Sequence, residues 1–337
     1  MMDNKATSVP ADRLIDPFGR HITYLRLSVT DRCDFRCIYC MDQDQRFARR
    51  DQVLTRDELL AVTRVFVSLG VRKVRLTGGE PLVRPDLIEL IQGIMALPDL
   101  DELVITTNGS QLAARAKAIR QSGVKRINIS LDSLRPDRFR QLTRWGDLAQ
   151  VLAGIDVAIA AGFERIKVNT VILGERNGDE ILDMVRFALD KGINISFIEE
   201  MPVGEVASRP RHFYSSERIR AQIEPLFRLI PTTETSGGPA RYYRIPDSAT
   251  RVGFISPHSH NFCADCNRIR VTAEGQLLLC LGREESLDLR AIVRRYPQDD
   301  EPLRRAIIDA MCRKPAGHRF EAGVSAVSGR HMNTTGG

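Results

Sequence analysis

The chain has 337 residues, of which 43% are hydrophobic and 27% are charged, so it can bury a large core and is long for one domain. No apolar run approaches the about 18 residues that a membrane-spanning helix needs, and residues 1–20 lack the basic-then-apolar pattern of a secretory signal. We therefore expect a cytoplasmic protein without a membrane partner.

The net charge of +6 indicates anionic partners, which could be nucleic acid, a membrane or a phosphorylated small molecule. Most of the positive charge is arginine, whose guanidinium binds phosphate through two parallel hydrogen bonds. A codon bias toward arginine explains the surface arginines equally well. Charge alone therefore does not identify the partner.

Apolar periodicity predicts strands and helices in strict alternation after a loose lead-in over residues 1–20. The helices at 56–69, 111–122, 148–161 and 178–190 each end next to a glycine that is suited to a C-cap, namely Gly70, Gly123, Gly162 and Gly192. A further helix is expected at 85–97. The predicted strands cover residues 22–29, 71–76, 103–106, 126–131, 166–173 and 193–198.

Six strands separated by helices indicate right-handed βαβ units in a parallel sheet, with ligands at the carboxyl ends of the strands. A curled, partly open (βα)6 barrel and a flat doubly wound sheet both satisfy this pattern. The alternation stops after Glu199, and residues 231–246 are rich in Pro, Gly, Ser and Thr. We predict an α/β domain over residues 1–230 and a C-terminal extension over 231–337.

Cys33, Cys37 and Cys40 form the pattern C-x3-C-x2-C directly after the first predicted strand. A four-iron cluster held by three thiolates keeps one iron free of protein ligands, and that iron can bind a small molecule and pass it an electron. Ferredoxin clusters and structural zinc sites normally use four protein ligands. A zinc site with a distant fourth ligand and a pair of disulfide partners with a spare cysteine are the alternatives.

Cys263, Cys266 and Cys280 form a second group, C-x2-C-x13-C. Two such groups in a reducing compartment indicate two metal sites rather than unpaired thiols. Zinc completed by His258 or His260 competes with a second iron–sulfur cluster here. Cys312 stands alone and is interpreted as a small core residue.

The tetrapeptide at residues 78–81, Gly-Gly-Glu-Pro, follows the second predicted strand. Its two glycines allow close approach of the backbone to a ligand, and Glu80 can accept a hydrogen bond from an ammonium group. An ordinary βα turn is the alternative.

Five basic residues lie in or beside predicted strands, where burial is costly unless the cation meets an anion. They are Arg26, Arg75, Lys167, Arg268 and Arg270. Any one of them could point into solvent at a strand end, but five together favour an anionic ligand.

The first cysteine pattern, with Tyr39 before its last cysteine and the glycine motif one strand later, resembles the radical S-adenosylmethionine (SAM) enzymes. Segments 30–40, 76–82, 106–109, 130–133 and 262–270, together with the terminal glycine pair, are similar to the GTP 3′,8-cyclase family over nearly the whole chain. By position, the resemblance assigns the first [4Fe-4S] cluster to Cys33, Cys37 and Cys40, and the second [4Fe-4S] cluster to Cys263, Cys266 and Cys280. It assigns SAM contacts to Tyr39, Gly79, Ser130 and Met201, and GTP contacts to Arg26, Arg75, Thr106, Lys167, Arg268, Ile269 and Arg270. It also gives Gly336 and Gly337 a catalytic role.

The resemblance implies a partial (βα)6 barrel with a C-terminal iron–sulfur extension. It also implies a lyase that converts GTP to (8S)-3′,8-cyclo-7,8-dihydroguanosine 5′-triphosphate, the first step of molybdenum cofactor biosynthesis. The partners that this assignment implies are a flavodoxin-like or ferredoxin-like reductant, cyclic pyranopterin monophosphate synthase as the next enzyme, and a second copy of the chain in a homodimer.

Two other functions stay open at this point. A radical SAM enzyme that modifies a peptide or RNA would consume SAM only when that macromolecule is present. A nucleic-acid-binding protein would show steeply salt-dependent binding. The sequence carries no basic low-complexity tail and no aromatic RNA-binding strand motif, so we expect no nucleic-acid partner.

Overall fold

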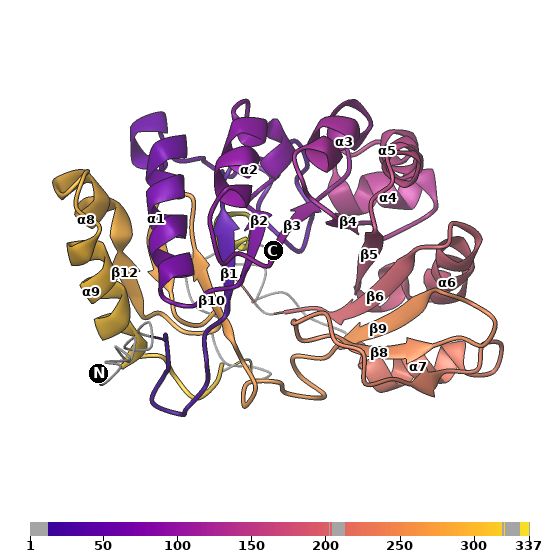
Figure 1. Cartoon of the computed structure of the whole chain (residues 1–337). Helices are drawn as coiled ribbons and strands as arrows, with labels where there is room; N and C mark the ends of the chain where they lie inside the picture. Colours follow the sequence, from indigo (N-terminus) through magenta and orange to yellow (C-terminus); the bar gives the residue numbers. More distant parts are fainter. Residues whose placement is uncertain (1–12, 202, 204–212, 319, 321–330, 337) are drawn as a thin grey trace, which may run out of the picture.

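The computed structural model describes residues 13–201, 203, 213–318, 320 and 331–336. Its centre is a run of six parallel strands that pair in chain order (Figure 1). These strands are β1 (Tyr24–Ser28), β2 (Lys73–Thr77), β3 (Glu102–Thr107), β4 (Arg126–Ser130), β5 (Arg165–Ile172) and β6 (Asn194–Glu199). The alternating pattern therefore produces the expected parallel sheet.

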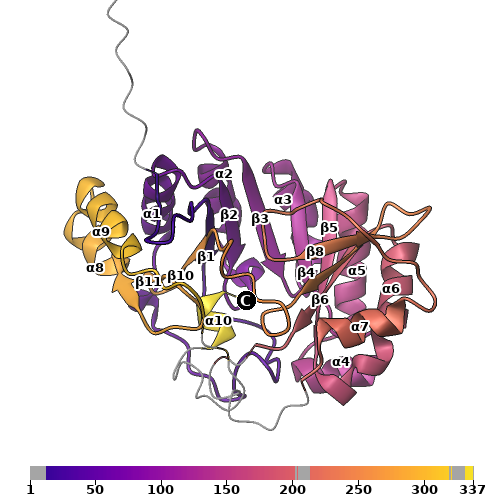
Figure 2. The same ribbon diagram turned by 90° about the horizontal axis from the view of Figure 1, so that it is seen from below.

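The helices that connect these strands cover the convex outer face of the curved sheet, as Figures 1 and 2 show. A flat doubly wound sheet would carry helices on both faces, so the architecture is the partial barrel. The connecting helices are α1 (Arg56–Ser68), α2 (Leu87–Met95), α3 (Leu112–Gln121), α4 (Pro136–Thr143), α5 (Leu148–Ala160) and α6 (Ile181–Asp190).

The C-terminal part of the chain extends the same sheet at both edges. β10 (Arg268–Val271) pairs parallel with β1, and β9 (Arg251–Ile255) pairs parallel with β6. The strand order is β12-β11-β10-β1-β2-β3-β4-β5-β6-β9-β8-β7. The remaining elements are α7 (Ser216–Ile223), β7 (Ile230–Pro231), β8 (Arg241–Arg244), β11 (Gln276–Leu278), β12 (Ser286–Asp288), α8 (Leu289–Arg295), α9 (Glu301–Met311) and α10 (Met332–Thr335).

Helix ends follow the sequence signals closely. Gly70, Gly123, Gly162 and Gly192 all have positive φ, between 64° and 98°, which confirms their prediction as C-caps. At the start of α1, Thr55 forms a capping box with Glu58.

One helix was not predicted, and one local prediction was wrong. The connection before α5 contains the extra helix α4, which begins at Pro136. The predicted loose lead-in is anchored from residue 13 onward, because Leu14 is buried and Arg20 forms a buried ion pair with Asp16, with 2.6 Å between Nε and Oδ2. One buried leucine and one ion pair produce no periodic pattern of apolar residues, so the sequence could not predict that this segment is held against the fold.

The two faces of the parallel sheet differ in polarity because successive side chains of a strand point to opposite faces. On β1, Leu25 and Leu27 belong to the hydrophobic core beneath the outer helices, whereas Arg26 lines the inner pocket. On β4, Ile127 and Ile129 pack in the core, and Asn128 lines the pocket. The side chains that face the barrel interior are therefore polar, and the hydrophobic core lies on the other face of the sheet, beneath the outer helices.

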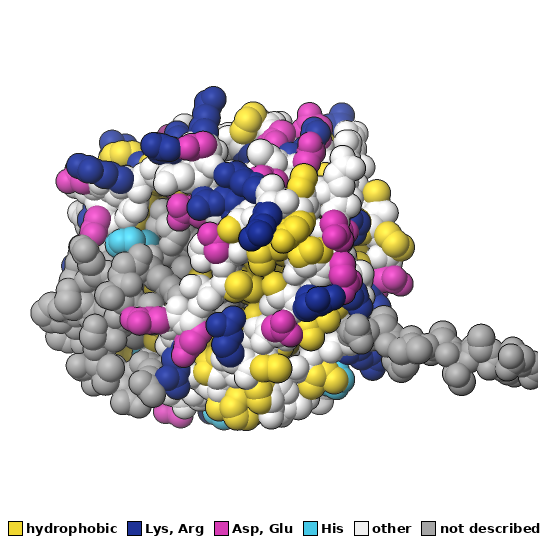
Figure 3. All heavy atoms as spheres, turned by 90° about the vertical axis from the view of Figure 1, so that its left-hand side faces the viewer, with side chains coloured by type: hydrophobic (Ala, Val, Ile, Leu, Met, Phe, Trp, Pro, Cys, Tyr) yellow, Lys and Arg dark blue, Asp and Glu magenta, His cyan; other side chains and the backbone are white. Residues whose placement is uncertain are grey.

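Figure 3 shows the face that carries α1, α8 and α9, where acidic and basic side chains are interspersed. Ion pairs join α1 to these helices, with 2.8 Å between Arg64 Nε and Asp300 and 2.7 Å between Arg294 Nε and Glu58. On this face the positive charge of the chain is not gathered into one patch. Within the described residues, no helix is both long enough and apolar enough to cross a membrane.

Candidate active site

The first cysteine loop and the glycine motif after β2 lie against each other at the carboxyl ends of β1 and β2. Gly79 N donates to Thr30 O at 2.8 Å, and Glu80 N donates to Arg32 O at 2.8 Å. A Cβ atom on Gly79 would collide with the Arg32 carbonyl, and one on Gly78 would collide with that of Thr30. The glycines are therefore required so that the cysteine loop can approach the β2 end.

Glu80 supports the fold of this region. Its carboxylate accepts hydrogen bonds from Leu82 N at 2.9 Å, Thr107 Oγ1 at 2.7 Å and Asn108 N at 2.6 Å. Burial raises its pKa to about 7. The three donors leave about one of the four acceptor positions of the carboxylate unused, so the hypothesis that Glu80 receives an ammonium group from a ligand stays a prediction.

Cys33, Cys37 and Cys40 are half-buried, and the pKa of each thiol is raised, chiefly by burial. Two N–H groups point at Cys33 Sγ, from Phe35 N at 3.4 Å and from Asn108 Nδ2 at 3.8 Å. Hydrogen-bond donors aimed at sulfur are the usual surroundings of cluster thiolates. The three residues fit an iron–sulfur cluster in this respect.

Tyr39 is held from the opposite side of the barrel. Its hydroxyl donates to Asp132 Oδ2 at 2.7 Å, and Val171 N donates to Asp132 Oδ1 at 2.8 Å. Burial first, and then the Asp132 carboxylate, raises the pKa of Tyr39 well above its usual value. The tyrosine predicted to contact SAM thus connects the cysteine loop to the ends of β4 and β5.

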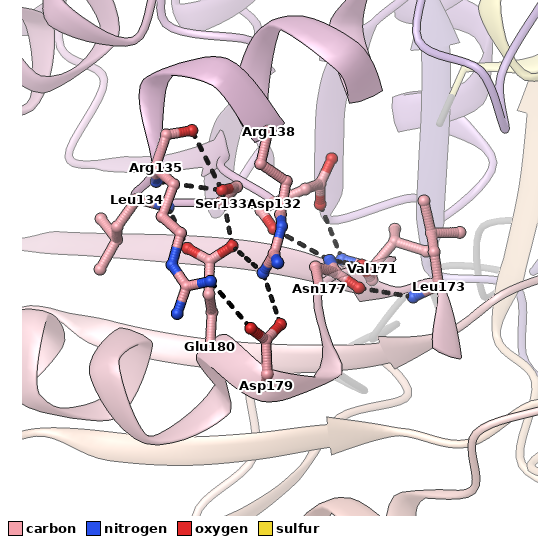
Figure 4. A network of polar contacts seen from close by, with 10 residues as sticks. All are labelled: Asp132, Ser133, Leu134, Arg135, Arg138, Val171, Leu173, Asn177, Asp179 and Glu180. Atoms are coloured by element: carbon pink, nitrogen blue, oxygen red, sulfur yellow. Dashed lines mark hydrogen bonds and ion pairs between the residues drawn. The ribbon is translucent and has the colours of Figure 1, made fainter. Parts of the chain in front are cut away.

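Behind Asp132, a polar network joins the loops that follow β4 and β5 (Figure 4). Asn177 Nδ2 donates to Asp132 O at 2.9 Å and to Val171 O at 2.8 Å. The buried Glu180 accepts from Ser133 Oγ at 2.7 Å and from Leu134 N at 2.7 Å. This network fixes Asp132 and, through it, Tyr39.

The inner face of the barrel lines a pocket that contains all five basic residues singled out from the sequence, namely Arg26, Arg75, Lys167, Arg268 and Arg270. Burial lowers the pKa of Lys167 to about 8 and that of Arg270 to about 10. These shifts mean that the free protein stabilises the charged forms poorly, as expected for cations placed to meet an anion.

Tyr24 lies among these cations and accepts a short hydrogen bond from Arg75 Nε. Burial would raise the pKa of its hydroxyl, but the charges of Arg75, Arg26 and Lys73 outweigh burial and lower that pKa to about 7. Arg75 Nη1 also donates to Thr106 Oγ1 at 2.9 Å. The predicted contacts Arg75 and Thr106 are therefore mutually positioned.

The same pocket is lined by Cys263, Cys266 and Cys280, so the second cysteine group faces the basic residues. Arg268 Nη2 lies 3.8 Å from Cys266 Sγ. Burial would raise the pKa of Cys266, but the charges of Arg268 and Lys314 outweigh it and lower that pKa. At Cys266 the cations therefore favour the thiolate, which is the form that binds a metal, whereas burial raises the pKa of Cys280.

Lys314 and Arg20 are two supporting residues that the sequence analysis did not single out. Lys314 Nζ donates to Arg268 O at 3.0 Å and to Leu279 O at 2.6 Å. Arg20 Nη1 donates to Cys263 O at 2.7 Å. Both side chains join segments far apart in the sequence, and no local motif marks such contacts.

No three His, Cys, Asp or Glu side chains within the described residues lie close enough together to hold a single metal ion. In a four-iron cluster each thiolate binds a different iron, so the sulfurs need not converge on one point. His258 Nε2 lies 2.9 Å from the Glu200 carbonyl oxygen, and His260 is exposed. Cys312 is exposed too, so its interpretation as a small core residue was wrong.

The C-terminal tail enters the barrel between the two cysteine groups, and Figure 2 shows α10 inside the curved sheet. Met332 N donates to Cys40 O at 3.2 Å, and Asn333 Nδ2 donates to Asp31 O at 3.2 Å. At its other end the Gly336 carbonyl accepts from Arg26 Nη2 at 3.1 Å and, by a shorter contact, from Arg270 Nη1. The tail therefore touches both the first cysteine loop and the cations of the pocket.

The structure brings most of the predicted site residues together. Met201 lines the pocket, and Ser130 is the last residue of β4. The side chain of Ile269 points away into the core, so that only its backbone faces the pocket between Arg268 and Arg270. Gly337 lies outside the described residues.

Two protein families match consecutive parts of the chain. Residues 27–188 match the Radical SAM superfamily, and residues 193–320 match Molybdenum Cofactor Synthesis C. The GTP 3′,8-cyclase of Ectopseudomonas mendocina (strain ymp) is 55% identical over 328 residues, which cover 97% of this chain and 99% of that protein. The GTP 3′,8-cyclase of Pseudomonas putida (strain W619) is 57% identical over 327 residues, which cover 96% of this chain and 98% of that protein.

Among solved structures, Streptococcus suis SuiB bound to S-adenosylmethionine is similar with a TM-score of 0.62. The match covers 86% of this chain and 68% of that chain at 17% identity. At that identity the likeness concerns the fold alone.

Proposed function

The chain belongs to the GTP 3′,8-cyclase family of radical SAM enzymes, and from this premise we propose that it converts GTP to (8S)-3′,8-cyclo-7,8-dihydroguanosine 5′-triphosphate. This reaction is the first step of molybdenum cofactor biosynthesis. The observation that carries the proposal is one pocket in which six cations, the second cysteine group and the C-terminal tail meet.

Cys33, Cys37 and Cys40 would hold the first [4Fe-4S] cluster, and Cys263, Cys266 and Cys280 would hold the second. When bound, the first cluster supplies the electron that cleaves SAM, and the second offers an open iron to the purine of GTP. Gly79, Ser130, Tyr39 and Met201 surround the SAM position in this proposal. Gly79 can contribute only backbone N–H and carbonyl groups to this contact, since it has no side chain.

The basic residues of the pocket neutralise the triphosphate. Arg26, Arg75 and Arg270 present guanidinium groups, which bind phosphate oxygens in pairs, and Lys167 adds a point charge. Holding the GTP ribose beside SAM makes hydrogen transfer from C3′ effectively intramolecular. The protein thus contributes position, charge and exclusion of water.

Gly336 and Gly337 complete the site in this proposal. The Gly336 carbonyl already contacts Arg26 and Arg270, so the tail orients two of the guanidinium groups that meet the triphosphate. A side chain at Gly336 would collide with Thr77, and the φ of +77° favours glycine.

The proposal also includes a flavodoxin-like or ferredoxin-like reductant, because the reaction needs an external electron. The product would pass to cyclic pyranopterin monophosphate synthase, and a homodimer is the assembly we expect.

The decisive experiment is anaerobic reconstitution with iron and sulfide, followed by incubation with GTP, SAM and dithionite. We expect about eight irons per chain if both [4Fe-4S] clusters assemble, and we expect 5′-deoxyadenosine together with the cyclised nucleotide. SAM cleavage that requires an added peptide or RNA, with no reaction of GTP, would contradict the proposal.

A further inference from the structure

Strand β4 places three polar side chains at successive levels of the barrel interior, because alternate residues of a strand share a face. Arg126 lies deepest, where its Nη1 is 3.4 Å from Glu102 Oε1. Ser130 ends the strand at the level proposed for SAM. Asn128 lies between them and lines the pocket, yet no sequence motif marks it.

Asn128 also fills a position in a row of proposed substrate contacts. Its β3 neighbour in the sheet register is Thr106, and its β5 neighbour is Lys167. Both neighbours are predicted GTP contacts, and both line the same pocket. Asn128 therefore belongs by geometry to the same surface.

The side-chain oxygen of Asn128 lacks a hydrogen-bond donor among the described residues. The residue is 1% exposed, and its Oδ1 atom is buried without a hydrogen-bond partner. A buried acceptor without a donor is destabilising, and folded proteins seldom retain one without a reason. The missing partner must be a donor, because Oδ1 can only accept.

We propose that Asn128 binds the ribose of GTP by accepting a hydrogen bond from one of its hydroxyl groups. The inference rests on the proposed function and adds a specificity-determining residue to it. The triphosphate offers only acceptors near neutral pH, and the purine belongs to the second cysteine group. The ribose must lie beside SAM for transfer from C3′, and Asn128 is one inward position below Ser130 on β4.

The test is anaerobic calorimetric binding of GTP, 2′-deoxy-GTP and 3′-deoxy-GTP to the reconstituted protein and to Asn128→Ala. We expect the substitution to weaken GTP binding about tenfold, because one buried hydrogen bond is lost. The deoxy analogue that lacks the partner hydroxyl should bind both proteins equally, as in a double-mutant cycle. The other analogue should lose the same affinity as GTP.

Asn169 provides a matched control. Its Oδ1 is also buried without a partner and it lines the same pocket, but it pairs with Ser130 at the level proposed for SAM. Asn169→Ala should leave the affinity for GTP within twofold of the parent protein. An equal loss of GTP affinity in both variants would show a general disturbance of the pocket and would overturn the assignment.

Thermal stability separates binding from folding. Removing an acceptor that has no partner in the fold should leave the melting temperature of Asn128→Ala unchanged or raise it, whereas a structural role would lower it. Unchanged GTP affinity in Asn128→Ala, or equal losses for all three nucleotides, would refute the inference. Failure of the parent protein to bind GTP at all would instead refute the proposed function.

Discussion

The two cysteine groups differ in how the chain builds them and in the charge around them. Cys33, Cys37 and Cys40 come from one loop of eight residues, whereas the second group combines cysteines on either side of β10 and β11. At the first loop, Asp34 accepts from Asn108 Nδ2 at 2.7 Å and Asp132 accepts from Tyr39, while Arg36 and Arg144 donate to backbone carbonyls of the loop.

The second group lies among cations, and this contrast matches the ligands proposed for each end. Arg268 contacts Cys266, and Lys314 is held beside it. SAM carries a sulfonium, an ammonium and a carboxylate group, whereas GTP carries a triphosphate. In the proposed function, the first loop with carboxylates and guanidinium groups around it binds SAM, whereas the guanidinium groups along the pocket wall bind the triphosphate.

The largest effect should come from removing one thiol of each group. Cys33→Ser should abolish SAM cleavage, and Cys263→Ser should keep uncoupled cleavage but form no cyclised product, because one site generates the radical and the other places the substrate. Chromatography of 5′-deoxyadenosine and of the nucleotide product measures both outcomes. Full product formation in both variants would refute the two-cluster assignment.

Removal of the glycine pair tests the tail that lies between the two groups. Deleting Gly336 and Gly337, or replacing them with Ala-Ala, should sharply reduce cyclisation while melting temperature and iron content stay at parent values. The deletion removes the carbonyl that contacts Arg26 and Arg270, and alanine at 336 would collide with Thr77. Lost iron would show that the change disturbed folding, and full activity would remove the tail from the mechanism.

Charge removal along the pocket wall should separate the two ligands. Arg268→Ala and Lys167→Ala should each weaken GTP binding about ten- to a hundredfold, since a charge-assisted hydrogen bond contributes about 1.5 to 3 kcal/mol. SAM affinity should change far less. Calorimetry with each ligand gives both constants, and equal losses for GTP and SAM would indicate misfolding.

A smaller effect concerns pH. Lys167 has a pKa of about 8 because of burial and the charges of Arg75 and Arg126, opposed by Tyr242. Below pH 8 the free protein already carries this charge, whereas above it GTP must bind together with a proton. Affinity should therefore fall by up to about tenfold per pH unit above 8.

Lys167→Arg is the control for this pH dependence, because arginine stays protonated throughout the range. Tyr24 faces the same cations and has a pKa of about 7, so it also loses a proton as the pH rises. Tyr24→Phe removes this second titrating group and serves as the other control. A slope that persists in both variants would assign the dependence to another group.

The sequence determined the parallel strands, the helix caps and the identity of both cysteine groups, because each depends on local periodicity or spacing. The five basic residues were also marked by the sequence, and the structure places Arg26 and Arg75 in the pocket while Leu25 and Leu27 belong to the hydrophobic core. The family resemblance supplied the remaining assignments to particular ligands.

Tertiary structure alone decided which distant residues share the site. β10 pairs with β1 across more than 240 residues, so Arg270 comes to lie beside Arg26 only through the sheet register. The positions of Lys314 and Asn128, the hydrogen bonds of Glu80 and the path of the tail likewise depend on long-range contacts. Periodicity and spacing report neighbours along the chain, whereas these contacts are set by how the elements pack.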